Sequence, residues 1–220
     1  MTNSQIDEIA CQPRRPGRPP IRSDEATLQL ILDAAMDAFV ADGFAGTGMS
    51  AVAQRAGVST KTLYRLVPTK AELFHKVVAG RTARFVLEID HLDNAAVEDV
   101  QAGLERLLTA YGNLTFAPDV MGVYRLVVSE TCRFPELGRT FHDLAIRKTT
   151  EVMANWLARQ RDLGRLRLAE PYLAAGMLRG MMVMEPQRAA LLGQAPPPDA
   201  AQIAERAKAC AAVFLKGCGV

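Results

Sequence analysis

The sequence predicts an all-α fold of about nine helices, in which a small module of three helices near the N-terminus precedes a larger helical domain. Apolar residues recur at spacings of three and four along nearly the whole chain, and glycine or proline interrupts them at positions typical of helix ends. No segment shows the apolar–polar alternation of a strand. The 220 residues, of which 49% are hydrophobic and 23% charged, suffice for a substantial core.

The first predicted helix spans residues 24–42. Five apolar residues in it recur every three or four positions: Leu28, Ile31, Leu32, Ala35 and Phe39. This spacing places them on one face of an amphipathic helix, which we expect to cover the two short helices that follow. Its acidic residues are expected to point outward, away from any nucleic acid bound to those helices.

Residues 43–70 contain the pattern of two short helices joined by a glycine turn. The first is predicted by apolar residues at helical spacing: Met49, Val52, Ala53 and Ala56. Thr47 or Ser50 is available as its N-cap. Gly57 ends it, because glycine adopts at no steric cost the positive φ that often follows a helix. Ser59 is the predicted N-cap of the next helix.

The second short helix presents a basic outer surface. Leu63 and Val67 lie four residues apart and are expected to face inward. The opposite stripe then carries polar and basic side chains flanked by a tyrosine: Lys61, Thr62, Arg65 and Tyr64. The whole stretch 43–70 has no acidic residue, although the net charge of the chain is only +2. Two helices in this arrangement place the second one in the major groove of DNA.

At these residues the segment resembles the helix-turn-helix of the TetR family of bacterial transcriptional regulators. The matching pieces are Gly43-Phe44, Thr47, Val52-Ala53, Ala56-Gly57-Val58-Ser59, Thr62-Leu63-Tyr64 and Lys70-Ala71-Glu72-Leu73. Gly48 and Val67 depart from the usual pattern. The resemblance implies that the last two long helices of each subunit pair into a four-helix dimer interface and that the middle helices enclose a ligand cavity. Residues 123–192 also resemble a C-terminal type found in some of these regulators.

The predicted DNA contacts fall into two groups. Lys61 and Thr62 are the candidates for base edges, because lysine donates to guanine and a threonine methyl packs on thymine. The candidates for phosphate are Ser59, Thr60, Tyr64 and Lys70, while Arg65 suits either role and Thr47 is included in the site. The alternatives are a packing role for Tyr64 and a solvated charged face for Lys61 and Arg65.

Residues 1–23 are predicted to be a disordered basic arm. Within it, residues 13–20 are too rich in proline for a helix and have no apolar residue for a core. Its arginines, Arg14, Arg15 and Arg18, stand in an order that resembles arms inserted into narrow minor grooves. The alternative is a solvated basic tail.

Proline and glycine residues divide the rest of the chain into separate predicted helices. We expect a helix-turn-helix domain at 24–70, a connecting helix and hinge at 71–94, and a ligand-binding and dimerisation domain at 95–220. Within the last, helices are expected to end before Pro118, near Cys132 and at Gly164. The next helix begins at Pro171 with a kink at Pro186, and the last spans residues 199–216.

Ligand-binding candidates were chosen as residues that suit an apolar wall with a few directed polar groups. They are Tyr111, Met121, Tyr124, Arg125, Phe141, His142, Trp156 and Met177. A core position is the alternative for the apolar members, and a surface ion pair for Arg125 or His142. For the methionines of residues 177–184, packing in the dimer interface is favoured over a drug-binding wall.

These features predict a repressor that binds a palindromic operator as a homodimer and is released by a small-molecule effector. The alternatives are an activator or an architectural DNA-binding protein without an effector. An enzyme is disfavoured, since Ser129-Glu130 and His142-Asp143 come with no nucleophile elbow, metal triad or phosphate loop. No cofactor and no metal site is expected.

The compartment is predicted from what the sequence lacks. It has no apolar stretch of about 18 residues and no apolar signal core, so we expect a cytoplasmic protein without a membrane partner. The four cysteines are scattered and are expected to be free thiols: Cys11, Cys132, Cys210 and Cys218.

Overall fold

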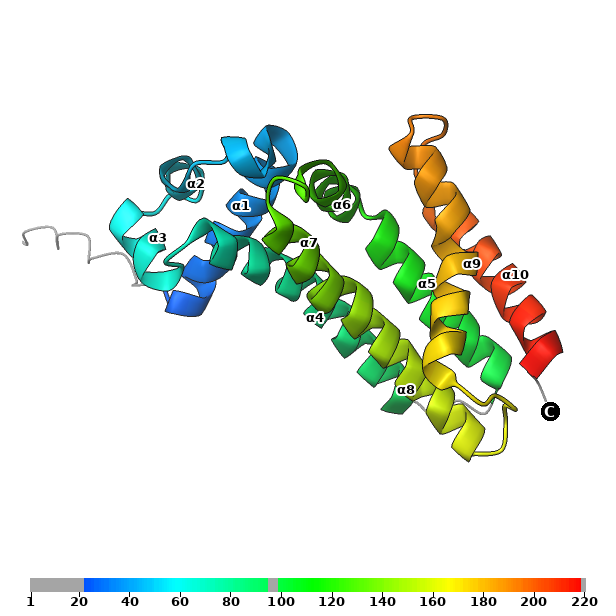
Figure 1. Ribbon diagram of the computed structural model, residues 1–220. Coiled ribbons are helices and arrows are strands. Elements are labelled where there is room, and N and C mark those ends of the chain that lie inside the picture. Colours follow the sequence, from blue (N-terminus) through cyan, green and yellow to red (C-terminus); the bar gives the residue numbers. More distant parts are fainter. Residues whose placement is uncertain (1–21, 95–98, 219–220) are drawn as a thin grey trace, which may run out of the picture.

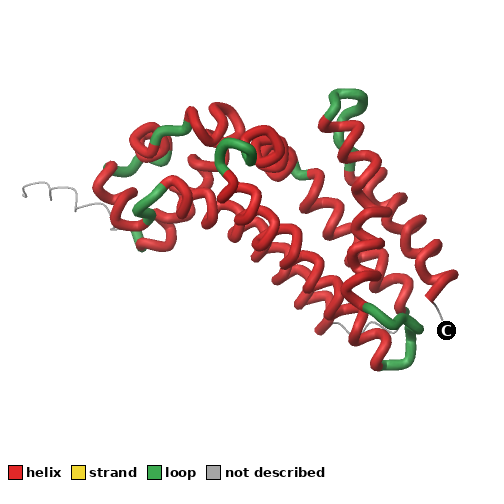
Figure 2. The backbone as a smooth tube through the Cα atoms, viewed as in Figure 1, coloured by secondary structure: helices red, strands yellow, loops and turns green. Residues whose placement is uncertain are grey.

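The computed structural model describes residues 22–94 and 99–218, and its regular structure in these ranges is helical throughout (Figures 1 and 2). The helices are α1 (Asp24–Gly46), α2 (Met49–Arg55), α3 (Thr60–Leu66), α4 (Lys70–Asn94), α5 (Val100–Phe116), α6 (Pro118–Glu130), α7 (Pro135–Phe141), the π-helical turn η1 (His142–Arg147), α8 (Lys148–Asp162), α9 (Pro171–Leu191) and α10 (Ala200–Cys218). Since α7, η1 and α8 follow one another without a break, these ranges hold nine helical rods. The predicted fold class is confirmed.

Local capping rules account for most boundaries in the N-terminal module. Ser59 caps α3 by accepting a hydrogen bond from the Thr62 amide at 3.0 Å. Gly57 ends α2 with φ at +66°. The predicted cap of α2 was wrong, because Gly48 holds that position without a side-chain bond. Thr47 is buried instead, and its hydroxyl donates to the Gly43 carbonyl oxygen at 2.7 Å.

The first helix extends past its predicted end but is interrupted at Gly43. This residue has φ +71° and ψ 173°, a left-handed conformation that favours glycine. The chain then makes one more helical turn, which carries Phe44 into the core. Gly43 therefore changes the direction of the chain between α1 and the turn that leads to α2.

Two hydrophobic clusters divide the described residues. The N-terminal cluster contains the buried side chains of α1 to α3 and the first half of α4, with Phe39, Phe44 and Phe74 packed ring against ring. It also includes Val123 and Leu126 of α6. The second and larger cluster joins the far half of α4 to α5, α8, α9 and α10. The core of the N-terminal module thus crosses the domain boundary predicted at residue 70.

The long helix α4 connects the two clusters. Leu73 and Phe74, near its start, are buried in the N-terminal cluster, whereas Phe85 and Ile89 are buried in the larger one. Figure 1 shows α4 running from the N-terminal module along the rod of α7 and α8. Helix α4 therefore contributes side chains to both cores, so a displacement of this helix would change the packing of each.

The C-terminal helices form the end of the molecule away from α2 and α3 (Figure 1). Helix α9 packs against α8, and α10 packs against α5. Gly164, with φ +71°, follows the end of α8 as predicted, and Pro186 lies inside α9 without ending it. None of the helices in the described part of the chain is long and apolar enough to cross a membrane.

Candidate functional site

Helix α3 displays the polar surface that the sequence predicts. Lys61 and Thr60 are exposed, and Tyr64 is 46% exposed. The Thr62 hydroxyl lies 2.8 Å from the Ser59 hydroxyl, so these two polar groups form a local hydrogen bond. Leu63 and Val67 are fully buried beneath this surface, which confirms the predicted orientation of the helix.

An acidic residue of α1 lies against the basic surface, contrary to the expectation that the acids of that helix point away from it. Both carboxylate oxygens of Asp24 accept hydrogen bonds from Arg65, at 2.6 and 2.7 Å. The hydrogen bond from Arg65 lowers the pKa of Asp24 below its usual range. The cause is packing, because the first turn of α1 lies beside α3 and acids are favoured at helix N-termini. Arg65 is therefore paired with a carboxylate of its own chain.

Lys70 points into the protein rather than toward the surface of α3. Its ammonium group donates to the carbonyl oxygens of Phe44 and Thr47, at 2.7 and 2.9 Å, and stands 4.8 Å from the centre of the Phe44 ring. These carbonyls belong to the interrupted end of α1 and the residue that follows it, where the regular series of backbone N–H donors is broken. Through these hydrogen bonds Lys70 links the start of α4 to the end of α1.

Replacement of Lys70 by methionine should lower the free energy of unfolding by about 1.5–3 kcal/mol, the usual contribution of hydrogen bonds to a charged group. Methionine keeps an unbranched side chain of similar length, so the decrease in the free energy of unfolding measures the contribution of the Lys70 ammonium group. Urea denaturation followed by circular dichroism measures it, with Lys61→Met as a surface control. Unchanged stability combined with weaker DNA binding would instead mark Lys70 as a phosphate contact.

Helix α6 is attached to α1 at two places. The Glu130 carboxylate accepts hydrogen bonds from the amides of Phe44, at 2.8 Å, and Ala45, at 3.2 Å. A Cβ at Gly43 would stand 2.6 Å from Glu130 Oε1, and one at Gly122 would stand 2.7 Å from Val40 Cγ1. Both glycines thus permit a close approach. We give one name, the α6 joint, to the contact of Glu130 with residues 43–45 and the contact of Gly122 with Val40.

The residues considered for catalysis have structural or surface positions. Glu130 belongs to the α6 joint, and the Ser129 hydroxyl donates to the Leu126 carbonyl of its own helix. His142 and Asp143 are exposed, with Nδ1 and Oδ1 3.4 Å apart. In the described part of the chain no group of His, Cys, Asp or Glu side chains is arranged to hold a metal ion.

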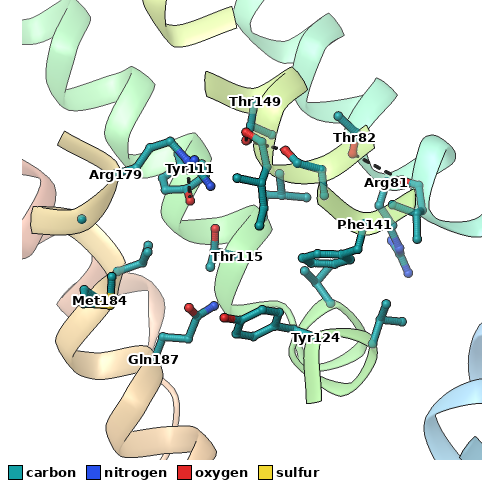
Figure 3. Close-up of a pocket in the computed structure, with 18 of the residues that line it drawn as sticks. Arg81, Thr82, Tyr111, Thr115, Tyr124, Phe141, Thr149, Arg179, Met184 and Gln187 are labelled. Carbon is teal, nitrogen blue, oxygen red and sulfur yellow. Dashed lines mark hydrogen bonds between the residues drawn. The ribbon is translucent and has the colours of Figure 1, made fainter. Parts of the chain in front are cut away.

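A cavity of ≈ 300 Å³ lies between the two clusters and beside the α6 joint. Its wall is formed by residues from α1, α4, α5, α6, the α7–η1–α8 rod and α9. Figure 3 shows Tyr124 and Phe141 on one side and Arg179 and Met184 on the other. Tyr124 and Phe141 stack with ring centres 5.5 Å apart. Because Met36 of α1 is also in the wall, the cavity touches the N-terminal module directly.

The polar groups of the cavity gather around two arginines. Arg179 donates through Nε to the Tyr111 hydroxyl at 2.9 Å and through Nη1 to the Thr150 hydroxyl at 2.6 Å. Arg81 forms an ion pair with Asp119. Burial, followed by a smaller effect of Arg84, lowers the pKa of Arg81, which remains a cation because arginine is not deprotonated in proteins.

The π-helical turn η1 places side chains in the cavity wall. Phe141 precedes it, and Ala145 and Ile146 lie within it. A π-turn shifts the helical register, so residues on both sides of it face the same space. Such turns occur often at functional sites. The sequence pattern from Pro135 to Gly164 gave no sign of this interruption.

Sequence profiles of two parts of one family match the chain. The profile described as "Bacterial regulatory proteins, tetR family" matches residues 31–77, which contain α2 and α3. The profile described as "AefR-like transcriptional repressor, C-terminal domain" matches residues 102–218. The chain belongs to the TetR family. Members of this family are regulators that bind operator DNA as dimers and respond to small molecules, and they are not enzymes.

Solved structures of TetR-family regulators share the fold. A putative TetR-family regulator from Mesorhizobium loti is 25% identical over 91% of this chain and 100% of its own, with a TM-score of 0.80. The flavonoid-responsive regulator FrrA is 26% identical over 89% of this chain and 98% of its own, with a TM-score of 0.65. The fatty acid degradation regulator FadR from Bacillus halodurans is 20% identical, covers 87% and 95%, and has a TM-score of 0.67. No curated protein matches the chain in sequence.

For this TetR-family protein, the structure places three of the eight ligand candidates in the cavity wall: Tyr111, Tyr124 and Phe141. Met121 and Trp156 are buried in the larger cluster, as core residues. Arg125 and Met177 are exposed, and His142 lies in its surface pair. Helical spacing alone did not separate these positions, because the apolar residues of each helix serve both the core and the cavity.

Several wall residues were missed in the sequence, Arg179, Arg81 and Gln187 among them. An arginine in the middle of an otherwise apolar helical segment was the available signal for Arg179. The predicted minor-groove arginines, Arg14, Arg15 and Arg18, lie outside the described residues.

Proposed function

We propose that this protein is a cytoplasmic repressor that binds a palindromic operator as a homodimer and leaves it when a small molecule enters the cavity. The proposal rests on helix α6, which contacts both the cavity and the DNA-binding module. Tyr124 of this helix is in the cavity wall. Glu130, at the end of the helix, accepts a hydrogen bond from Phe44 in the last turn of α1. A ligand that shifts α6 therefore acts on the DNA-binding module.

The surface of α3 supports a specific arrangement of DNA contacts. Lys61 and Thr62 are positioned to meet base edges, and Ser59, Thr60 and Tyr64 to meet phosphates. Arg65 reaches DNA only by sharing or leaving its ion pair with Asp24. Thr47 and Lys70 are dropped from the DNA contacts, since the first is buried and the second is bonded to carbonyls.

Replacement of Lys61 by alanine should weaken operator binding by about 1–3 kcal/mol if it reads a base. The loss should be concentrated on sequences that carry the preferred base at that position. Fluorescence anisotropy with the operator and single-base variants measures it, and Lys148→Ala at an exposed position of α8 controls for the lost charge. An equal loss on every sequence would assign Lys61 to a phosphate instead.

Helix α9 supports the dimer. It is apolar around nearly its whole circumference, which is typical of a helix covered on all sides. Leu173, Met177 and Met184 nevertheless remain 58%, 58% and 48% exposed. A second copy of the chain would cover this face and also the side of the cavity to which Met184 belongs.

The DNA-bound and the effector-bound protein would differ in the positions of α4 and α6. The effector fits the cavity in one arrangement of α4 and α6, and DNA fits the other, so each ligand shifts the population away from the other. The response of FrrA to flavonoids supports a small-molecule effector in this fold. An architectural protein without an effector, or an activator, is the second candidate function, and no specific contact favours it.

The experiment that tests operator binding is selection of bound duplexes from random DNA with the purified full chain. We expect an inverted repeat whose half-sites lie about one helical turn, roughly 34–36 Å, or a multiple of it apart. Enrichment of a single, asymmetric half-site would contradict the dimeric repressor. A screen for small molecules that raise the melting temperature of the full chain separates a sensor from an architectural protein.

A further inference from the structure

We propose that Arg179 is the anchor for the carboxylate of the effector, and that the effector is a monoanionic molecule with a compact apolar body. The inference rests on the proposed effector cavity and names the chemistry that this cavity selects.

The charge of Arg179 has no counter-ion among the residues that the structure describes. Its guanidinium is partly buried in the cavity wall, and both of its hydrogen-bond partners, the hydroxyls of Tyr111 and Thr150, are neutral. Nη2 donates to no group in the part of the chain that the structure describes. No aspartate or glutamate is among the described residues that line the cavity. A cation in such surroundings is costly unless an anion accompanies it.

Several other arginines in the described part of the chain do have carboxylate partners. Arg65 pairs with Asp24, Arg81 with Asp119 and Arg206 with Glu185. The pair that involves Arg81 matters most here, because Arg81 is the other cation of the cavity wall. Since Asp119 already balances Arg81, one uncompensated positive charge remains, which favours an effector with one negative charge over one with two.

The guanidinium is also held in a fixed orientation. Its carbon lies 5.2 Å from the centre of the Tyr111 ring, while Nε and Nη1 are bonded to the hydroxyls of two different helices, α5 and α8. Figure 3 shows Arg179 and Tyr111 side by side at the edge of the cavity. Arginine recognises carboxylates through a planar array of N–H donors, so a pre-set plane lowers the entropy lost on binding.

The rest of the wall specifies the body of the effector. Opposite Arg179 lie Tyr124 and Phe141, which offer aromatic contact (Figure 3). Val123 adds an aliphatic side chain to the wall. The cavity volume of ≈ 300 Å³ is at the lower end of the range of about 300–1,000 Å³ for small-molecule sites, so it suits a small effector. A medium-chain or aryl carboxylic acid has this size and this division into a charged end and an apolar end.

The test compares acids with their amides on the full chain. Octanoate and 4-butylbenzoate are titrated by calorimetry beside octanamide and 4-butylbenzamide, which keep the shape and remove the charge. We expect at least one acid to bind the protein tenfold or more tightly than its amide. Arg179→Gln should abolish this preference, whereas Arg179→Lys should keep part of it. Arg125→Gln, which removes an exposed arginine of α6 outside the cavity wall, should leave it intact.

Three results would overturn the inference: neither acid binds, the amides bind as tightly as the acids, or the preference survives in a folded Arg179→Gln protein. Circular dichroism confirms the fold, and Arg179→Lys supplies the comparison if the glutamine variant does not fold. Operator affinity is measured in the same samples. If an amide releases the operator, the sensor function stands and only the choice of a carboxylate fails.

Discussion

Glutamates introduced together at Leu173 and Met177 should dissociate the homodimer and weaken operator binding by a factor on the order of 10²–10⁴, the gain expected from joining two binding units. Both side chains are 58% exposed on α9, so the substitutions remove no packing from the core of one subunit. Four charges facing one another across a twofold axis would be buried without partners in the dimer, which is strongly unfavourable. Sedimentation velocity and fluorescence anisotropy measure the two effects.

The matched control is Leu87→Glu on α4. Leu87 is 59% exposed but lies outside α9 and α10, so it should leave both mass and operator affinity unchanged. A double variant that remains dimeric, with wild-type affinity, would place the dimer interface elsewhere on the chain.

Replacement of Glu130 by glutamine should have the second largest effect. Both carboxylate oxygens accept amide hydrogens, whereas a glutamine must turn its NH₂ group toward one of these donors. We expect the free energy of unfolding to fall by about 1.5–3 kcal/mol, as for other hydrogen bonds to a charged group. A ligand that releases the wild-type protein from its operator should also lose most of its effect, because α6 no longer holds the turn after α1.

Urea denaturation and operator titrations with and without the ligand measure these two changes. Glu88→Gln, at an exposed position on α4, serves as the control for the lost charge. Full ligand response in the Glu130→Gln protein would show that the signal reaches the DNA-binding module by another route, such as α4 alone.

Local rules predicted the helix-turn-helix well. The cap by Ser59, the positive φ at Gly57 and the burial of Leu63 and Val67 all follow from neighbours within a few residues. Such local rules could not predict contacts between residues that are far apart in the sequence. The pair of Asp24 and Arg65 spans 41 residues, and the hydrogen bond that the Phe44 amide donates to Glu130 spans 86. Only the packing of whole helices brings these groups together.

The cavity was harder to predict for a related reason. Helix α9 is apolar on nearly all sides, so periodicity cannot say which face meets the core, the cavity or a partner. Met177 was expected in the cavity wall and is exposed outside it, while Arg179, two residues further, is in the wall. The register shift at η1, invisible in the sequence pattern, likewise decides which residues of its rod face the cavity.

The central claim is that the cavity and the DNA surface are coupled through α6. The most direct measurement is the affinity of a cavity-binding molecule, identified by thermal shift, for the free protein and for the protein saturated with operator. We predict that operator weakens ligand binding about 5- to 150-fold and that the ligand weakens operator binding by the same factor. Equal ligand affinity with and without operator, for a molecule shown to occupy the cavity, would contradict the account.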